Sequence, residues 1–200
     1  MPPDLPTVFL IRHGQTDWSL SGRHTGRTDR PLTAQGEIEA AALARRLRGI
    51  DFRRVLTSPR LRARQTCDRA GLGVAAEITS DLSEWDYGTF EGLTTVEIQR
   101  IQPDWDLFRD GCPGGESPAQ VAERADRLVH RLQESEGSSA AFSHGHFLCV
   151  LAARWIGLAV EEARHLLLAT ASLSIVGFHP HRGRTPAIRL WNEESRASEG

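Results

Sequence analysis

The hydrophobic residues of this chain fall into short apolar runs that alternate with segments of helical spacing. Residues 8–11 form an unbroken run of four apolar side chains shortly after a proline, which is typical of a buried strand. Similar short runs predict further strands at 55–57, 77–82, 140–142, 172–178 and 187–191.

Helical spacing appears between these predicted strands. Thr33 can cap a helix whose apolar positions Ala40, Leu43 and Leu47 lie on one face. Ser117-Pro118-Ala119-Gln120 is the clearest helix start, because it combines a capping box with proline at the first helical position. We expect further helices over 61–70 and 147–156.

The alternation of strands and helices predicts the fold class α/β, as a three-layer α/β/α sandwich around a mostly parallel sheet. A length of 200 residues suits one domain over 1–200, with a frayed tail at 195–200. Residues 14–32 are polar and contain several glycines, which predicts a long loop. Loops of that length in compact domains are usually functional.

Composition narrows the possible partners and the compartment. The net charge of -2 argues against a general nucleic-acid or membrane-surface binder, so any attraction for anions must be local. We see neither a signal peptide nor an apolar run of membrane-spanning length. The three scattered cysteines fit reduced thiols, so we expect a cytoplasmic protein. None of them begins the C-x5-R loop that a cysteine nucleophile of a phosphatase would need.

Side chains suited to phosphoryl transfer follow the ends of the predicted strands. Because the carboxyl ends of parallel strands meet at one edge of a sheet, we expect these side chains in one site. A histidine there could attack phosphorus, arginines and a protonated histidine could neutralise phosphate oxygens, and a carboxylate could serve as general acid and base. Each residue alone also has an ordinary structural explanation, so the prediction rests on the set. The set is Arg12, His13, Arg62, Glu84 and His144.

Five ordered motifs also carry a resemblance: L-I-R-H-G-Q-T, L-T-S-P-R-L-R-A-R-Q-T, E-W-D-Y-G-T-F-E-G, G-G-E-S and S-H-G-H. Together they resemble the histidine phosphatase superfamily, which contains the cofactor-dependent phosphoglycerate mutases and many phosphatases. The resemblance runs from about Val8 to Trp191 and implies a phosphoglycerate-mutase-like fold. It implies a phosphohistidine on His13, with Glu84 as the catalytic general acid/base. It also implies a phosphate pocket made by Arg12, Arg62 and the catalytic His144.

In such relatives the loop after the nucleophile touches substrate as well. The resemblance therefore adds four substrate-binding candidates: Thr16, Ser19, Arg23 and Thr25. Ser19 stands where the family usually has asparagine, which leaves open whether that phosphate contact is kept. Gly14 is expected to give the backbone room to approach phosphate.

The spacing after Glu84 separates a hydrolase from a mutase. The mutases carry a long, basic insertion after the motif with the catalytic glutamate, whereas here 31 residues separate Glu84 from Glu116. The basic residues in that segment are Arg100 and Arg109. We therefore expect a metal-independent phosphatase, with a cofactor-dependent phosphoglycerate mutase as the alternative. Several blocks further resemble the acid phosphatase and sedoheptulose-bisphosphatase branches. This resemblance implies that the partner is a small phosphorylated metabolite such as a sugar phosphate. Arg109 or Arg23 could then meet a second anionic group of the substrate.

Two other classes of function are weighed against this one. His144 and His146, with His13, His24 and Asp86, could form a metallohydrolase site, but no second His-x-His motif accompanies them, so we expect no metal and no cofactor. A non-catalytic interaction module is disfavoured because the full set of pocket residues is present. The oligomeric state stays open, a homodimer included.

Overall fold

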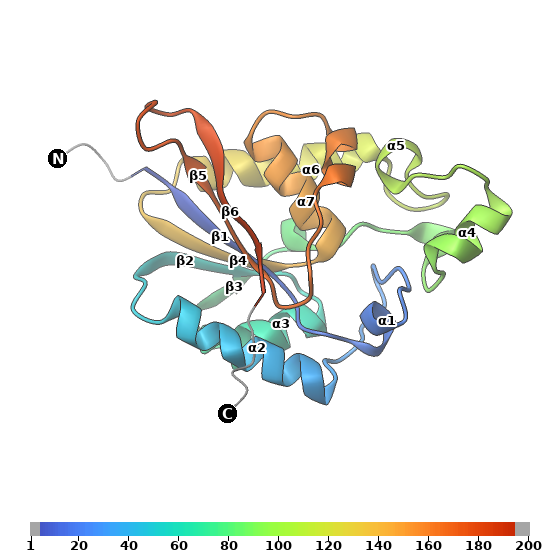
Figure 1. The fold of residues 1–200 in the computed structure, drawn as a ribbon, viewed down its shortest axis with the longest axis horizontal. Coiled ribbons are helices and arrows are strands. Elements are labelled where there is room, and N and C mark those ends of the chain that lie inside the picture. Colours follow the sequence, from blue (N-terminus) through green and yellow to red (C-terminus); the bar gives the residue numbers. More distant parts are fainter. Residues whose placement is uncertain (1–4, 195–200) are drawn as a thin grey trace.

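The protein is built around a six-stranded mixed sheet (Figure 1). The computed structural model describes residues 5–194, so the expected frayed tail at 195–200 lies outside the described residues. The strand order is β3-β2-β4-β1-β5-β6. Neighbours from β3 to β1 pair in parallel, whereas β5 runs antiparallel to both β1 and β6, which confirms the mostly parallel sheet. The strands are β1 (Thr7–Arg12), β2 (Phe52–Thr57), β3 (Ala76–Ile78), β4 (Ser138–Ser143), β5 (Leu173–Phe178) and β6 (Pro186–Glu193).

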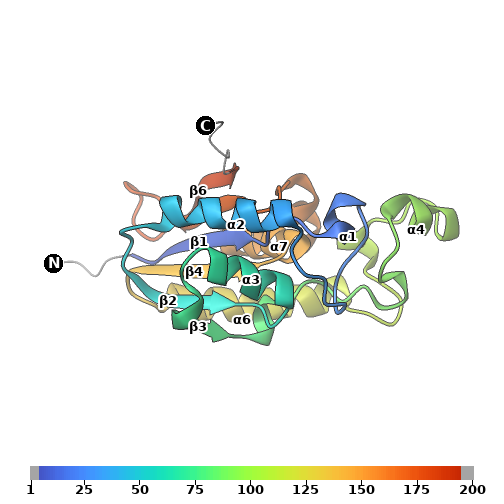
Figure 2. The same cartoon turned by 90° about the horizontal axis from the view of Figure 1, so that it is seen from below.

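Helices cover both faces of this sheet. The pair α2 and α3 lies on one face and the pair α6 and α7 on the other, which confirms the three layers (Figures 1 and 2). The α-helices are α1 (Asp17–Leu20), α2 (Ala34–Leu47), α3 (Leu61–Arg69), α4 (Thr95–Ile101), α5 (Leu107–Asp110), α6 (Pro118–Gln133) and α7 (Gly145–Trp155). The short 3-10 helices are η1 (Gly73–Ala75), η2 (Ser80–Leu82), η3 (Gly88–Phe90) and η4 (Val160–His165).

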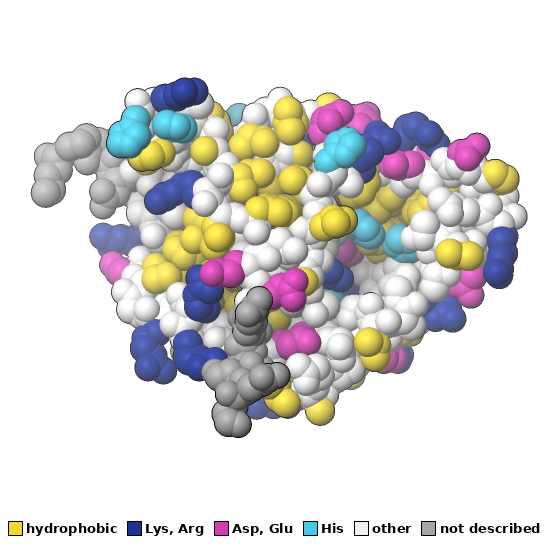
Figure 3. Space-filling view, viewed as in Figure 1, with side chains coloured by type: hydrophobic (Ala, Val, Ile, Leu, Met, Phe, Trp, Pro, Cys, Tyr) yellow, Lys and Arg dark blue, Asp and Glu magenta, His cyan; other side chains and the backbone are white. Residues whose placement is uncertain are grey.

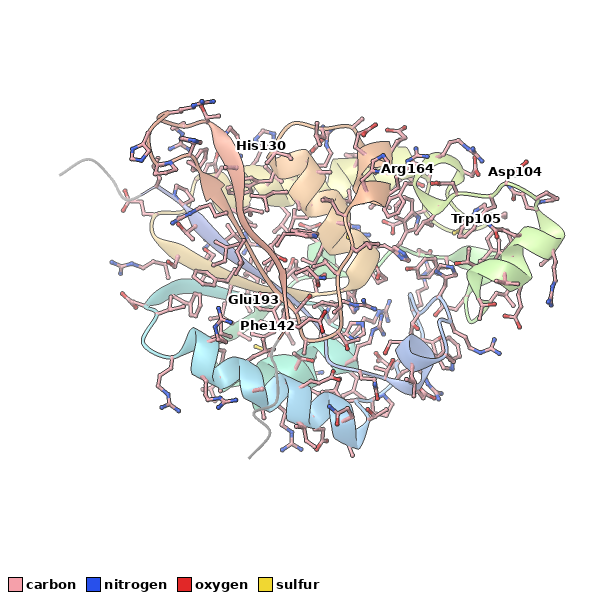
Figure 4. The ribbon with its side chains drawn as sticks, in the orientation of Figure 1. Asp104, Trp105, His130, Phe142, Arg164 and Glu193 are labelled. Atoms are coloured by element: carbon pink, nitrogen blue, oxygen red, sulfur yellow. The ribbon has the colours of Figure 1, made fainter. Side chains whose placement is uncertain are left out.

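Burial on both faces explains the unbroken apolar run of β1. Val8 and Leu10 belong to the core under α6 and α7, whereas Phe9 and Ile11 belong to the core under α2 and α3. Phe142 of β4 lies in the second core, between the sheet and α2 (Figure 4). Within residues 5–194, no helix is long and apolar enough to cross a membrane.

The structure differs from the sequence prediction where short helices depend on capping rather than on apolar periodicity. The expected loop 14–32 contains α1, which Thr16 caps. Helices α4 and α5 were not predicted, although Thr94 and Glu97 form the capping box that begins α4. The third strand ends at Ile78 instead of residue 82, because residues 80–82 turn into η2. Helix α7 begins at Gly145, two residues before the predicted start.

Candidate active site

The residues that follow β1, β2 and β4 lie together because these strands are neighbours in the sheet. Arg12 pairs with Ser143 in the β1–β4 ladder. The next residue, His13, donates its amide to the Ser143 carbonyl at 3.0 Å. Ser58, one residue beyond β2, donates its amide to the Phe142 carbonyl at 3.0 Å. The topology therefore brings these chain segments to one edge, as the sequence predicted.

His13 presents an uncharged ring to this edge. Only 5% of the residue is exposed. Its Nδ1 lies 2.8 Å from the Gly14 carbonyl oxygen, which can only accept, so Nδ1 donates and Nε2 keeps its lone pair. Burial, followed by the charges of Arg62 and Arg12, lowers the pKa of His13 well below 6.5. At neutral pH the ring can therefore act as a nucleophile through Nε2.

Arg62 and Ser58 hold His144 in a neutral tautomer, whereas a protonated ring facing phosphate was expected from the sequence. The ring is fully buried, and its Nδ1 accepts a hydrogen bond from Arg62 Nε at 3.1 Å. Its proton therefore sits on Nε2, which donates to Ser58 Oγ at 2.8 Å. Burial and then the Arg62 charge lower the pKa of His144 well below 6.5. The His144 and His13 ring centroids are 5.2 Å apart.

Arg62 joins this strand edge to the long loop. It is fully buried, and besides His144 it donates to the Thr25, Gly26 and Thr28 carbonyls at 2.7, 3.2 and 3.1 Å. Four of the five guanidinium N–H groups thus bind acceptors within residues 5–194, and Arg62 is not among the residues that line the cavity described below. Arg62 therefore holds the long loop beside His144.

Arg12 carries an unused donor at the site. Its Nη1 donates to the Leu168 carbonyl, whereas its buried Nε has no hydrogen-bond partner in the described part of the chain. The guanidinium packs on Gly145, where a Cβ would come within 3.2 Å of Arg12 Cζ and Nε. Gly145 is the first residue of α7. A guanidinium with a free donor beside a helix N-terminus is an arrangement that suits an anion.

Glu84 lies against the same helix N-terminus. Its Oε1 accepts from the Phe147 amide at 2.8 Å and its Oε2 from the His146 amide at 3.2 Å. Both amides belong to the first turn of α7, whose N-cap residue His144 makes no side-chain cap. Glu84 thus supplies the missing cap, which explains why α7 starts before its apolar run.

Arg12, His13 and Glu84 share one cavity of about 280 Å³. In Figure 3 the surface is hollowed between the body of the molecule and the segment that carries α1 and α4, and histidine side chains line the hollow. Three ring side chains that were not among the predicted catalytic or phosphate-binding residues complete this wall: His24, Tyr87 and His146.

These three rings form an uncharged, hydrogen-bonding surface. The Tyr87 hydroxyl lies 2.6 Å from His146 Nδ1, and His24 Nε2 lies 3.2 Å from Thr95 Oγ1. The His24 ring centroid is 4.8 Å from that of Tyr87 and 5.6 Å from that of His146. Burial lowers the pKa of both His24 and His146 to about 4, so both are neutral at pH 7. The sequence pointed to His24 through its place in the long polar loop and through the metallohydrolase alternative.

The four substrate-binding candidates of the loop divide into two groups. Ser19, Arg23 and Thr25 line the cavity. Thr16 is fully buried and caps α1: its Oγ1 accepts from the Ser19 amide at 3.0 Å while Ser19 Oγ accepts from the Thr16 amide at 2.8 Å. Thr16 therefore supports the loop, and Arg23 is itself held by the Gly92 carbonyl at 2.6 Å.

Gly14 approaches protein backbone, which differs from the expected approach to phosphate. A Cβ at Gly14 would lie 2.4 Å from the carbonyl oxygen of Gly36 in α2. The Gly14 amide donates to Thr66 Oγ1 at 3.0 Å. The glycine therefore lets the loop after β1 pack tightly on α2.

The metallohydrolase alternative invoked His13, His24, His144, His146 and Asp86. Within residues 5–194, no three histidine, cysteine, aspartate or glutamate side chains gather so that they could hold a metal ion. Both ring nitrogens of His144 are engaged by Arg62 and Ser58. Asp86 pairs with Arg27 at 2.6 Å.

Comparison with known proteins identifies a family and relatives of this chain. The family model described as histidine phosphatase superfamily (branch 1) matches residues 8–194. An acid phosphatase of Mycobacterium tuberculosis is 45% identical over 176 residues, which cover 86% of this chain and 86% of that protein. The sedoheptulose 1,7-bisphosphatase of Saccharomyces cerevisiae is 37% identical over 196 residues, covering 81% of this chain and 72% of that protein.

The fold agrees with a solved structure too. The structure of an open reading frame from Mycobacterium tuberculosis superposes with a TM-score of 0.88 at 38% identity, covering 95% of this chain and 98% of that one. Because the family model spans nearly the whole chain, this protein belongs to the histidine phosphatase superfamily.

Proposed function

We propose that this protein is a phosphatase that hydrolyses small phosphate monoesters through a phosphohistidine intermediate on His13. The observation that carries the proposal is the neutral His13 ring with Nε2 free, in one cavity with the unused donor of Arg12 and the Glu84 carboxyl group. A nucleophile, an anion-binding group and a general acid/base are the parts that this reaction needs.

The proposed reaction has two steps. In the first, His13 Nε2 forms a bond to phosphorus, the bond from phosphorus to the ester oxygen breaks, and Glu84 gives a proton to the departing alkoxide. In the second, Glu84 takes a proton from water, the water oxygen attacks phosphorus, and the phosphorus–nitrogen bond breaks to release phosphate. Arg12, the positive charge of Arg62 and the N-terminus of α7 offset the charge on the phosphoryl oxygens. His144 serves this pocket by orienting Arg62 beside His13.

The rest of the cavity supports a polyhydroxylated substrate such as a sugar phosphate. Neutral His24 and His146 and the Tyr87 hydroxyl offer hydrogen bonds without adding charge. The acid phosphatase and bisphosphatase names of the relatives support the same substrate class.

Hydrolysis is favoured over mutase activity because, in the part of the chain that the structure describes, the cavity offers no arginine dedicated to a second anionic group. Arg23 is the other arginine that lines the cavity within residues 5–194, and it already pairs with Glu97 at 3.4 Å. Arg109 is exposed and pairs with Asp110 at 2.7 Å. With 3-phosphoglycerate and bisphosphoglycerate supplied together, we expect free phosphate to form faster than 2-phosphoglycerate. A dominant flux to 2-phosphoglycerate would establish the mutase instead.

We further propose that the reaction needs no metal and takes place in a reducing compartment, the cytoplasm. The nucleophile, the general acid/base and the anion-binding groups of the proposed steps are all side chains or backbone of this protein, so a chelator should leave the rate unchanged. The compartment is supported by three buried cysteines without disulfide partners: Cys67, Cys112 and Cys149.

Trapping the intermediate tests the proposal. Brief incubation with a labelled phosphate monoester and a quench should give a phosphoenzyme that is stable in alkali and labile in acid. The label should be absent from His13→Ala and present in His165→Gln, a matched change of a histidine whose side chain is 69% exposed. Label retained in His13→Ala, or activity lost to a chelator and restored by zinc, would overturn the mechanism.

A further inference from the structure

The segment that carries Glu84 is held from behind by one buried arginine of α6. Arg124 is 8% exposed and uses all five of its N–H groups. It donates to the carbonyls of Asp81, Ser83 and Glu84 at 3.0, 2.7 and 3.4 Å. Its other two donors, Nε and Nη2, meet the Glu116 carboxylate at 3.0 and 2.8 Å. Five accepted hydrogen bonds use every donor of a guanidinium and exceed what the three donors of a lysine can satisfy.

Glu116 fixes the other side of the same segment. Its Oε2 also accepts from the Asp86 amide at 2.9 Å, and its own amide donates to the Asp86 carbonyl at 2.9 Å. Its carbonyl accepts from the Trp85 indole at 2.9 Å. The Arg124–Glu116 pair therefore holds backbone on both sides of Glu84.

Arg124 also contacts the residue that holds the Glu84 carboxylate. Its Cζ lies 4.2 Å from the centroid of the Phe147 ring. The Phe147 amide in turn donates to Glu84 Oε1 at 2.8 Å. One guanidinium thus sets the place of the Glu84 backbone and packs on the helix turn that orients its side chain.

We infer that Arg124 is a positioning residue for the acid–base step, with Glu116 as its partner. The inference rests on the proposed role of Glu84. A proton donor must lie within hydrogen-bond reach of the leaving oxygen, and a displacement of about 1 Å can cost about 10²-fold in rate. Loss of the Arg124 contacts releases three carbonyls of the Glu84 segment, so the carboxyl group shifts while Arg12 and His13, at the end of β1, stay in place.

Two substrates with different leaving groups can distinguish a positioning role of Arg124 from a general effect on the stability of the protein. An alkyl phosphate releases a strongly basic alkoxide that needs a proton, whereas 2,4-dinitrophenyl phosphate releases a weakly basic phenolate that does not. For Arg124→Lys we expect kcat/KM to fall about 10²-fold on glycerol phosphate and to stay within about threefold on the dinitrophenyl ester. Thermal unfolding shows that the variant is folded. Arg131→Lys, on the same helix in a surface pair with Glu77, should change neither value.

Glu84→Gln is the reference that separates the two hypotheses. If it lowers kcat/KM equally on both esters, the proposed acid–base role of Glu84 fails. If Glu84→Gln discriminates between the esters but folded Arg124→Lys lowers both equally, or lowers neither, only the inference about Arg124 is overturned. If Arg124 and Glu84 act on the same step, kcat/KM on glycerol phosphate should be no lower in the double variant Glu84→Gln, Arg124→Lys than in Glu84→Gln alone.

If Arg124→Lys does not fold, a second variant, Glu116→Gln, tests the inference about Arg124. Glu116→Gln keeps the volume but replaces one carboxylate oxygen with an amide nitrogen, which cannot accept from Arg124 or from the Asp86 amide. It should show the same preference for the dinitrophenyl ester. If Glu116→Gln changes kcat/KM by the same factor on both esters, the inference is contradicted.

Discussion

Lowering the pH from 7 to 5 should destabilise this protein through four histidines of the site, of which His13, His24 and His144 are buried. Burial lowers the pKa of His13, His24, His144 and His146 below the ordinary value of 6.5. In the unfolded chain each ring regains that ordinary value, so the unfolded state binds more protons once the pH falls below about 6.5. The free energy of unfolding therefore falls as the pH falls through this window.

The size of the effect follows from the two histidines whose pKa is about 4, His24 and His146. Between about pH 6.5 and 4 each costs about 1.4 kcal/mol per pH unit. From pH 7 to pH 5 that amounts to about 2 kcal/mol for each ring, and His13 and His144 act in the same direction. Domains have unfolding free energies of about 5–15 kcal/mol, so the loss is a large fraction of the total. Below about pH 4 these two rings protonate in both states and their contribution stops growing.

Denaturant unfolding followed by tryptophan fluorescence at pH 7, 6 and 5 measures the effect. His24→Phe keeps a ring against Tyr87 and Trp105 but removes one titrating group. It should make the difference in unfolding free energy between pH 7 and 5 smaller by about 2 kcal/mol. His165→Gln, at an exposed position, should leave that difference unchanged. The same pH dependence in the unchanged protein and in His24→Phe would refute the reasoning.

Three further predictions concern the site. Because the pKa of His13 is lowered, kcat/KM should decline on the acid side only below pH 6.5, and a decline centred above that pH would contradict a neutral His13. Inorganic phosphate at about 100 times its Kd should raise the unfolding free energy by about 2.7 kcal/mol, and Arg12→Gln should weaken this protection, as followed by Tm. Ser58→Ala removes the acceptor of the buried His144 Nε2–H and should lower the free energy of unfolding by about 1–3 kcal/mol, as measured by denaturant unfolding. Ser58→Thr keeps the hydroxyl group and should lower it less, provided that the added methyl group fits.

The strands and long helices follow directly from local sequence. The unbroken run at residues 8–11 reads as a strand covered on both faces, and the structure buries its side chains alternately in two cores. The Ser117 capping box with Pro118 marks the start of α6 at the correct residue. Helices α1, α4 and α5 were missed because four to seven residues offer too little apolar periodicity, and their caps were the available signal.

The site was predicted in part. Arg12, His13 and Glu84 lie in one cavity, as expected for residues that follow strands of one sheet. The neutral tautomer of His144 was not predicted, because it depends on which ring nitrogen Arg62 reaches, a contact between residues 82 positions apart. The loop residue His24 was not among the predicted catalytic or phosphate-binding residues, because its distance from Tyr87 depends on how the loop folds back.

By itself, the sequence determined the layered α/β fold and the family of this protein, because hydrophobic period, caps and ordered motifs are local properties of the chain. It also determined which chemical groups follow the strands. Only the tertiary structure decided their protonation, the shape of the cavity and the hold of Arg124 on the Glu84 segment. These properties depend on burial and on the distances between side chains from separate elements, which no local pattern contains.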